Sequence, residues 1–252
     1  KKKKHNQYLM SKKSEDQKEK KTTSLHFASE RDHVYHVRRL LKEKVNVNVL
    51  DENGQTSLHL ATKNNNWDPV KLLLDHQANV NISDKNGQTP LHIASKRNRY
   101  SITDKLLKHH AKVDSVDKKG HTPLYLACKK NHYSIADILL KHHANVDDVD
   151  KKGQTPLHIA CKQHNWALTD KLLEYHAQVD VIDKKGRTPL YFACINDDYL
   201  IAESLLKNHA KVDFKLFDTG YTPLMIACES GSLRTATILL ENNADIDMFN
   251  IN

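Results

Sequence analysis

The chain has 252 residues, of which 38% are hydrophobic and 28% are charged, and its formal net charge is +8. This length suits one large domain or two ordinary ones, but the hydrophobic share is low for a single deep core. No apolar run approaches the roughly 18 residues of a membrane span, and no apolar signal segment follows Lys1–Lys4. The first residue is not Met, as in a processed chain or a fragment.

Residues 1–21 form the first region of the chain. They are mostly Lys, Glu, Gln and Ser and show no apolar period. Such a segment cannot bury enough apolar surface to fold by itself. We therefore predict a basic, mobile tail without packed tertiary contacts.

After the tail, a short string of residues recurs with a period of 33. It reads GQTSLHLA at Gly54, GQTPLHIA at Gly87 and GYTPLMIA at Gly220, where one inserted residue lengthens the last interval to 34. A degenerate copy lies at Thr23–Ala28. A 33-residue period with the pattern T-P-L-H-x-A resembles the ankyrin repeat, which has a β-turn and two helices per unit.

The resemblance implies an all-α fold, an ankyrin-repeat solenoid of about seven helix-turn-helix units with β-hairpin fingers, over residues 22–252. We place the units at about 22–50, 51–83, 84–116, 117–149, 150–182, 183–216 and 217–249. Each unit buries apolar surface only against its neighbours, which explains the low hydrophobic share. The last repeat has no clearly polar outer face, which favours further repeats or another domain after it.

Local signals within the repeat agree with two helices. Thr89 is suited to cap a first helix that begins at Pro90, since proline loses no bonded N–H there. We predict Asp68, Ser101 and Ser134 as caps of second helices. Two turn positions that are usually Gly in the family instead carry Asn, Asp, His or Gln, each at a cost of up to about 1–2 kcal/mol if the backbone is left-handed. The insertion at Phe214–Phe217 should give the sixth unit a different finger.

The four cysteines occupy one position in four successive repeats: Cys128, Cys161, Cys194 and Cys228. Stacked helices lie about 8–10 Å apart, which is too far for a disulfide. We predict free, buried thiols. Free thiols fit a reducing compartment, so we expect a cytoplasmic protein, with the nucleus as the alternative.

The histidines form two columns along the predicted stack. The T-P-L-H column holds His26, His59, His92 and His158, with Tyr or Met in other repeats, and the second column holds His110, His143, His176 and His209. Neighbours within a column should lie about 10 Å apart, too far to share a zinc ion. No G-x-S-x-G, P-loop or H-E-x-x-H motif is present. We predict that the chain is not an enzyme and has no catalytic residue, metal site or cofactor.

Charge placement is the strongest functional signal. Partners of ankyrin proteins usually contact the finger tips and the exposed end of the first helix, so the resemblance makes thirteen cations candidates for partner binding. These are Lys85, Lys96, Arg97, Lys118, Lys119, Lys129, Lys130, Lys151, Lys152, Lys162, Lys184, Lys185 and Arg187. With the four finger aspartates subtracted they leave +9, slightly more than the +8 of the whole chain. The alternative is an ordinary solvated lysine-rich surface.

An aromatic column begins the predicted second helices. It holds Trp67, Tyr100, Tyr133, Trp166 and Tyr199. These rings either pack between repeats or form a ladder at the foot of the binding face, since Trp and Tyr are common binding hot spots.

We therefore predict an intracellular scaffold that binds an acidic segment of another protein on a basic concave face. We expect no small-molecule substrate and no membrane insertion. One alternative is nucleic-acid binding through phosphates, with a steep salt dependence. The basic stripe lacks the exposed aromatics of a base-stacking platform, which disfavours it. Another alternative is a structural arm of a larger protein such as a channel, a toxin or a ligase adaptor.

Overall fold

A computed structural model describes residues 24–217 and 219–248. The chain divides into two compact units, with unit 1 ending at Lys118 and unit 2 beginning at Lys119. The predicted tail at residues 1–21 lies outside the described residues. Within the described residues no strand is found, and no helix is long and apolar enough to cross a membrane.

The described residues form seven helix pairs, the first of which joins helical residues 24–30 to α2. In unit 1 the further helices are α2 (Val34–Lys42), α3 (Ser57–Asn64), α4 (Trp67–Asp75), α5 (Pro90–Lys96) and α6 (Tyr100–Lys108). In unit 2 they are α7 (Pro123–Lys129), α8 (Tyr133–Lys141), α9 (Pro156–Lys162), α10 (Trp166–Glu174), α11 (Pro189–Asn196), α12 (Tyr199–Lys207), α13 (Pro223–Glu229) and α14 (Leu233–Glu241).

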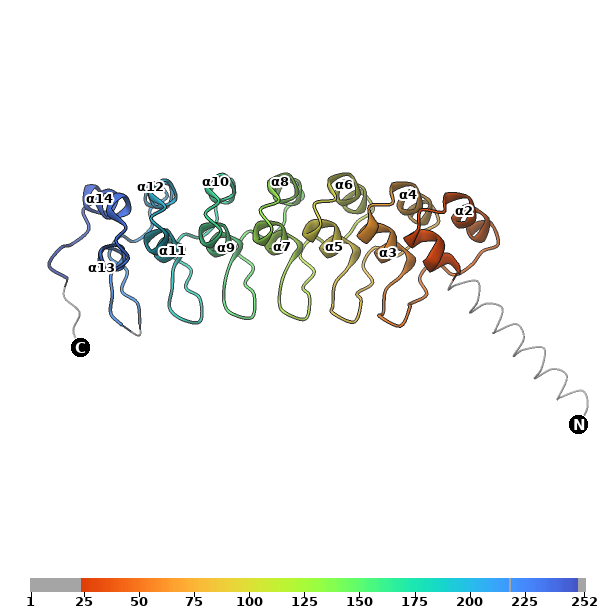
Figure 1. Cartoon of the computed structure of the whole chain (residues 1–252), viewed down its shortest axis with the longest axis horizontal. Coiled ribbons are helices and arrows are strands. Elements are labelled where there is room, and N and C mark those ends of the chain that lie inside the picture. Colours follow the sequence, from red (N-terminus) through yellow and green to blue (C-terminus); the bar gives the residue numbers. More distant parts are fainter. Residues whose placement is uncertain (1–23, 218, 249–252) are drawn as a thin grey trace, which may run out of the picture. The chain divides into compact units, whose positions relative to one another are not determined.

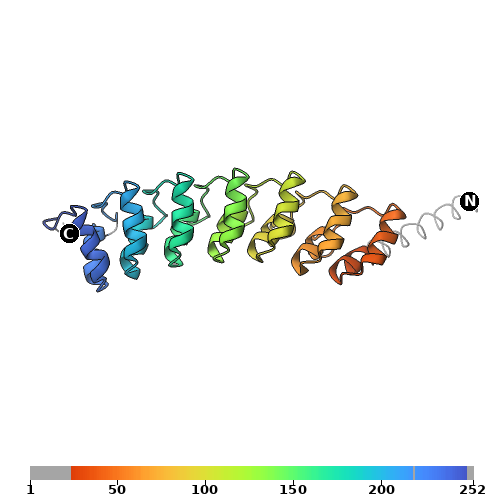
Figure 2. The same ribbon diagram turned by 90° about the horizontal axis from the view of Figure 1, so that it is seen from above.

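Each repeat contributes one helix to each of two layers. In unit 2 the first helices α7, α9, α11 and α13 lie side by side, and the second helices α8, α10, α12 and α14 form the other layer (Figures 1 and 2). The fingers extend from the layer of first helices (Figure 1). The core lies between the layers and between neighbouring repeats, where side chains such as Leu157, Leu168 and Leu172 are fully buried.

The T-P-L-H string starts each first helix as predicted. The Thr155 hydroxyl accepts a hydrogen bond from the backbone N–H of His158 at 3.3 Å, and Pro156 is the first helical residue. The same threonine cap is present at Thr122, Thr188 and Thr222.

The predicted caps of the second helices were wrong. These helices begin two residues earlier than predicted, at the aromatic residue, so that Asp68, Ser101 and Ser134 lie inside the first turn. The true N-cap residues in those three helices make no side-chain cap bond. These three helices are therefore held by the burial of their apolar face, without a side-chain cap.

The two turn positions that lack the family glycine are left-handed, as expected. For example, Asn131 has φ +57° and His143 has φ +61°. Asn and His tolerate this region better than most residues with a Cβ. The fold thus uses left-handed turns at both positions in spite of the side chains.

The cysteine prediction is confirmed for three positions and wrong for the fourth. All four thiols are free, and burial raises the pKa of Cys128 and of Cys161 to about 12. Cys194 is also buried, but Cys228 is exposed. Asp198 of the following repeat lies close enough to Cys161 to act on its pKa. Cys228 lies in the helix pair α13 and α14, the last pair of the described residues.

Candidate protein-binding surface

Each regular finger is a tight turn held by a buried aspartate. In the finger of residues 150–154, the backbone N–H of Asp150 donates to the carbonyl of Gln154 at 3.0 Å. The Asp150 carboxylate accepts hydrogen bonds from the backbone N–H groups of Lys152 and Gln154 at 2.8 and 2.9 Å. Asp150 is buried, while Lys151 and Lys152 are exposed. The finger therefore turns its acid inward and its lysines outward.

Neighbouring fingers are joined through their backbones. In unit 2 the N–H of Lys151 donates to the carbonyl of Lys119 at 3.3 Å, and the N–H of Lys184 donates to the carbonyl of Lys152 at 2.9 Å. The Gln154 side chain adds a bond from Nε2 to the Asp183 carboxylate at 3.1 Å. Lysines of successive fingers, 32 residues apart in sequence, are consequently neighbours in space.

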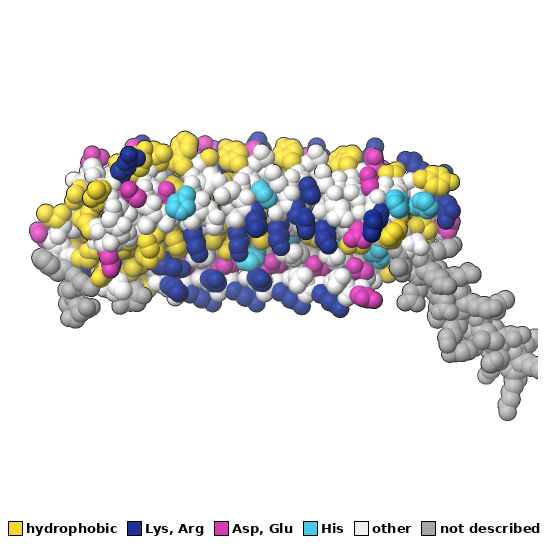
Figure 3. Space-filling view, in the orientation of Figure 1, with side chains coloured by type: hydrophobic (Ala, Val, Ile, Leu, Met, Phe, Trp, Pro, Cys, Tyr) yellow, Lys and Arg dark blue, Asp and Glu magenta, His cyan; other side chains and the backbone are white. Residues whose placement is uncertain are grey.

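The thirteen predicted cations fall into two groups. Unit 1 carries Lys85, Lys96, Arg97 and Lys118, and all four are exposed. Unit 2 carries the other nine, of which eight are exposed and define what we call the basic surface: Lys119, Lys129, Lys130, Lys151, Lys152, Lys162, Lys184 and Lys185. In unit 2, Lys and Arg side chains gather over the fingers and over the adjoining first helices (Figure 3).

Lys129 shows that the two rows of this surface act on each other. Partial burial lowers the pKa of Lys129, and the positive charges of Lys119, Lys152 and Lys130 lower it further, whereas the Asp150 carboxylate raises it. Two of these neighbours belong to fingers, whereas Lys129 ends helix α7. At Lys129, lysines of the finger row and of the helix row are thus close enough to repel one another.

Arg187 is engaged within the fold. Its Nη2 and Nε atoms lie 2.6 and 3.0 Å from Oδ2 of Asp183, and its guanidinium lies 4.9 Å from the ring centroid of Phe192. Burial alone would raise the pKa of Asp183, but hydrogen bonds from the side chain and backbone of Arg187 outweigh it, so this pKa is lowered. The charge of Arg187 is therefore largely matched by Asp183.

The histidines of the T-P-L-H column connect neighbouring repeats. Nδ1 of His158 accepts from the N–H of Thr155 at 3.2 Å, so its Nε2 carries the proton and donates to the carbonyl of Arg187 at 3.0 Å. His59 makes the corresponding bond to Gln88 in unit 1. Burial lowers the pKa of both rings. Across the described residues, no three His, Cys, Asp or Glu side chains are grouped closely enough to hold a metal ion.

The sixth finger differs from the others, as the insertion predicted. The N–H of Leu216 donates to the carbonyl of Tyr221 at 2.9 Å, which closes a turn one residue longer than the regular one. Leu216 is 9% exposed and lies where a regular finger has its aspartate, whereas Phe217 is 72% exposed. A Cβ built on Gly186 would approach the Phe217 ring to 3.1 Å, so this ring lies against the preceding finger.

The aromatic column lies at the surface. Trp67 and Tyr100 in unit 1 and Tyr133 and Trp166 in unit 2 are 40–51% exposed. Tyr199 is partly covered by the Arg234 guanidinium, 5.4 Å from its ring centroid. The exposed halves of these rings are available for contacts, although the covered halves still pack against the protein.

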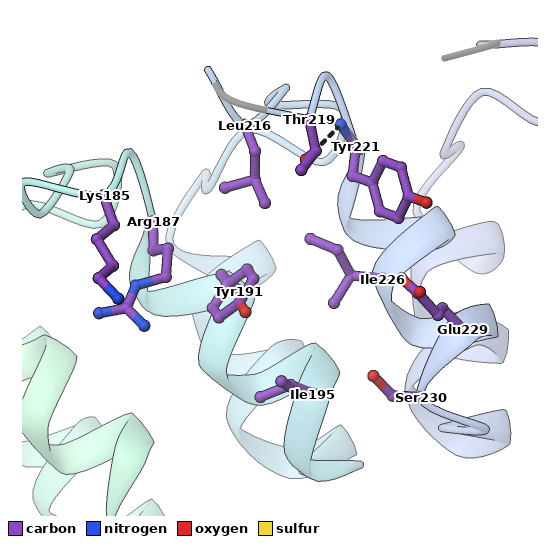
Figure 4. Close-up of a pocket in the computed structure, with 10 residues that line it drawn as sticks. All are labelled: Lys185, Arg187, Tyr191, Ile195, Leu216, Thr219, Tyr221, Ile226, Glu229 and Ser230. Carbon is purple, nitrogen blue, oxygen red and sulfur yellow. Dashed lines mark hydrogen bonds between the residues drawn. The ribbon is translucent and has the colours of Figure 1, made fainter. Parts of the chain in front are cut away.

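A hollow of about 490 Å³ between α11 and α13 had not been predicted from the sequence (Figure 4). It is lined by Lys185, Arg187, Tyr191, Ile195, Leu216, Thr219, Tyr221, Ile226, Glu229 and Ser230. A second hollow, of about 460 Å³, lies in unit 1 beside Trp67 and Tyr100. The sequence does carry a sign of the hollow between α11 and α13, because Ile195 stands where Lys129 and Lys162 stand in earlier repeats.

Comparisons with known proteins agree with this architecture. The family pattern described as "Ankyrin repeats (3 copies)" matches residues 3–84, 25–117, 70–150, 96–183 and 165–250. The solved human ASB11 ankyrin repeat domain is 27% identical, with a TM-score of 0.74, covering 88% of this chain and 98% of that one. The ankyrin repeat domain of Bcl-3, described as a unique member of the IkappaB protein family, is 26% identical, with a TM-score of 0.78, covering 86% of this chain and 97% of its own. No curated protein matches the sequence.

The chain therefore belongs to the ankyrin repeat family, and its fold is an all-α ankyrin-repeat solenoid. Domains of this family are generally protein–protein interaction modules and are typically not enzymes.

Proposed function

We propose that the chain binds an acidic segment of another protein on the basic surface of unit 2. The observation that carries this proposal is the contrast between two sets of lysines. On the second helices, Lys141 and Lys207 each lie 2.7 Å from a carboxylate four residues earlier. Over the described part of the chain, no ion pair engages Lys151, Lys152, Lys184 or Lys185 on the fingers.

This contrast favours a ligand of opposite charge. Aligned lysines repel one another and lower the stability slightly, and a surface shaped by stability alone would mix signs as the second helices do. The finger aspartates offset part of this charge, but their carboxylates are buried and bonded to the finger backbone, so that only the lysines are presented to solvent. Exposed charge pairs contribute modestly to affinity, so the basic surface would mainly govern the encounter rate and the choice of partner.

The test is a charge reversal with a matched control. We expect isothermal titration calorimetry to detect binding of a capped octaglutamate peptide, and the variant with Lys119, Lys151, Lys152 and Lys184 all changed to Glu to lose at least about thirtyfold in affinity, from four pairs of about 0.5 kcal/mol each. The control changes Lys141, Lys171, Lys207 and Lys211 to Glu, which alters the net charge equally but away from the fingers. Circular dichroism should show both variants folded.

Equal loss in the two variants would mean that only total charge matters, and the proposal would then be wrong. An oligothymidylate of the same length is the probe for the alternative ligand class. If it bound more tightly than octaglutamate, and with a steep salt dependence, nucleic acid would be the better assignment.

A further inference from the structure

The hollow between α11 and α13 lies where the basic surface ends. Along the first helices, the position of Lys129 and Lys162 is taken by Ile195 and then by Glu229. Along the fingers, the lysines up to Lys185 give way to the divergent finger with its exposed Phe217. The helix row therefore becomes apolar at Ile195 and acidic at Glu229, and the finger row becomes apolar at Phe217, in the repeat that follows Ile195.

The walls of the hollow combine apolar and aromatic side chains with polar and charged ones. Tyr191 and Ile195 come from α11, Tyr221 precedes α13, and Ile226 lies on α13 itself (Figure 4). The Arg187 guanidinium lies 5.7 Å from the ring centroid of Tyr191 and is anchored by Asp183, so this wall is held in place. Ile195 is 45% exposed, which leaves apolar surface open to a ligand.

The two sides of the rim of the hollow carry opposite charges. Lys185 lies on the side of the regular fingers, and Glu229 lies on the opposite side (Figure 4). A carboxylate of a bound segment would be attracted on the Lys185 side and repelled beside Glu229. An acidic segment should therefore reach the hollow from the finger side and end there.

We propose that the hollow between α11 and α13 receives an aromatic side chain at the end of the acidic segment that the basic surface binds. This inference rests on the proposed function. The volume of about 490 Å³ lies within the range of natural ligand pockets, about 300–1,000 Å³. Aromatic rings packed in such pockets are frequent hot spots beside charged contacts that contribute less. The hollow supplies specificity that a row of lysines lacks.

The experiment compares three capped, unlabelled peptides by calorimetry: octaglutamate, and octaglutamate with one tryptophan at either end. We expect one of the two tryptophan peptides to bind the parent chain about tenfold more tightly than octaglutamate does. Ile195→Lys restores the lysine of earlier repeats and fills the mouth of the hollow. It should abolish the tryptophan gain while leaving octaglutamate binding equal or slightly tighter.

Val149→Lys is the matched control, since Val149 is 49% exposed and is not among the lining residues. This variant should keep the tenfold gain. Tyr221→Ala provides a second variant of the hollow should Ile195→Lys not fold, as judged by circular dichroism.

The outcomes separate the two proposals. If octaglutamate binds but tryptophan adds less than twofold, the aromatic site is rejected and the basic surface stands. A gain that persists in Ile195→Lys and Tyr221→Ala would place the tryptophan elsewhere and also reject the site. If none of the three peptides binds, both proposals fail.

Discussion

Two neighbouring fingers of unit 2 hold their turns by opposite means: one has a buried carboxylate and the other has a buried apolar side chain. The finger of residues 183–187 is held by the buried Asp183 carboxylate, which accepts from two backbone N–H groups and from Arg187. The finger of residues 216–221 has Leu216 buried in that place. The first presents lysines to solvent and the second presents Phe217. The buried residue thus sets the turn, and the tip is free to specify a ligand.

The largest expected effect is a loss of stability on replacing the buried residue of each of the two fingers. Asp183→Ala should lower the free energy of unfolding by about 3 kcal/mol, because it leaves Arg187, the finger amides and the Gln154 amide without their acceptor. Leu216→Ala should cost about 2 kcal/mol through lost apolar contact alone. Urea denaturation of the full chain measures both. A smaller loss for Asp183→Ala than for Leu216→Ala would mean that the polar network is not what holds the regular finger.

A smaller loss of stability should follow from a fall in pH, because a histidine supports the finger of residues 183–187 but not the divergent finger of residues 216–221. His158 donates to the carbonyl of Arg187, whereas Tyr191 occupies that position in front of the divergent finger. The pKa of His158 is lowered by burial, so the unfolded chain takes up a proton first as pH falls below about 6.5. The stability from this residue is therefore complete above that pH and is lost below it, by at most about 1.4 kcal/mol per pH unit.

Urea denaturation at pH 7.5 and 5.5 checks this expectation. His158→Tyr, which copies Tyr191, should lose less stability between the two pH values than the parent chain does. His176→Asn is the control, since His176 is exposed and the last repeat has Asn243 there. Identical acid losses in the parent and in His158→Tyr would contradict the assigned role of the ring.

The sequence was sufficient for the features that repeat and insufficient for those that depend on a neighbour. The period and the T-P-L-H string predicted the helices, the threonine caps and the left-handed turns because each is local to one unit. Cys228 was mispredicted because it shares the local string of the other three cysteines, and its exposure is not visible in that string. The caps at Ser101 and Ser134 were mispredicted because those helices begin without a side-chain cap bond, two residues before the predicted start.

The same distinction between local and neighbour-dependent features applies to the candidate binding surface. The exposed lysines could be read from their column, but the pairing of Arg187 with Asp183 needed the three-dimensional arrangement. The hollow lies between two repeats, so no single motif encodes it. Its trace in the sequence is the loss of lysine at Ile195 on one first helix and at Phe217 on the finger that follows.

Carbodiimide cross-linking of octaglutamate to the folded chain tests the central claim most directly, because this reagent joins a carboxylate to a lysine amine only where the two are in contact. Peptide mapping by mass spectrometry should find the links at Lys119, Lys151, Lys152, Lys184 and Lys185, on the fingers. Links found mainly at Lys141 and Lys207, on the second helices, would contradict the assignment of the finger lysines as the partner-binding surface.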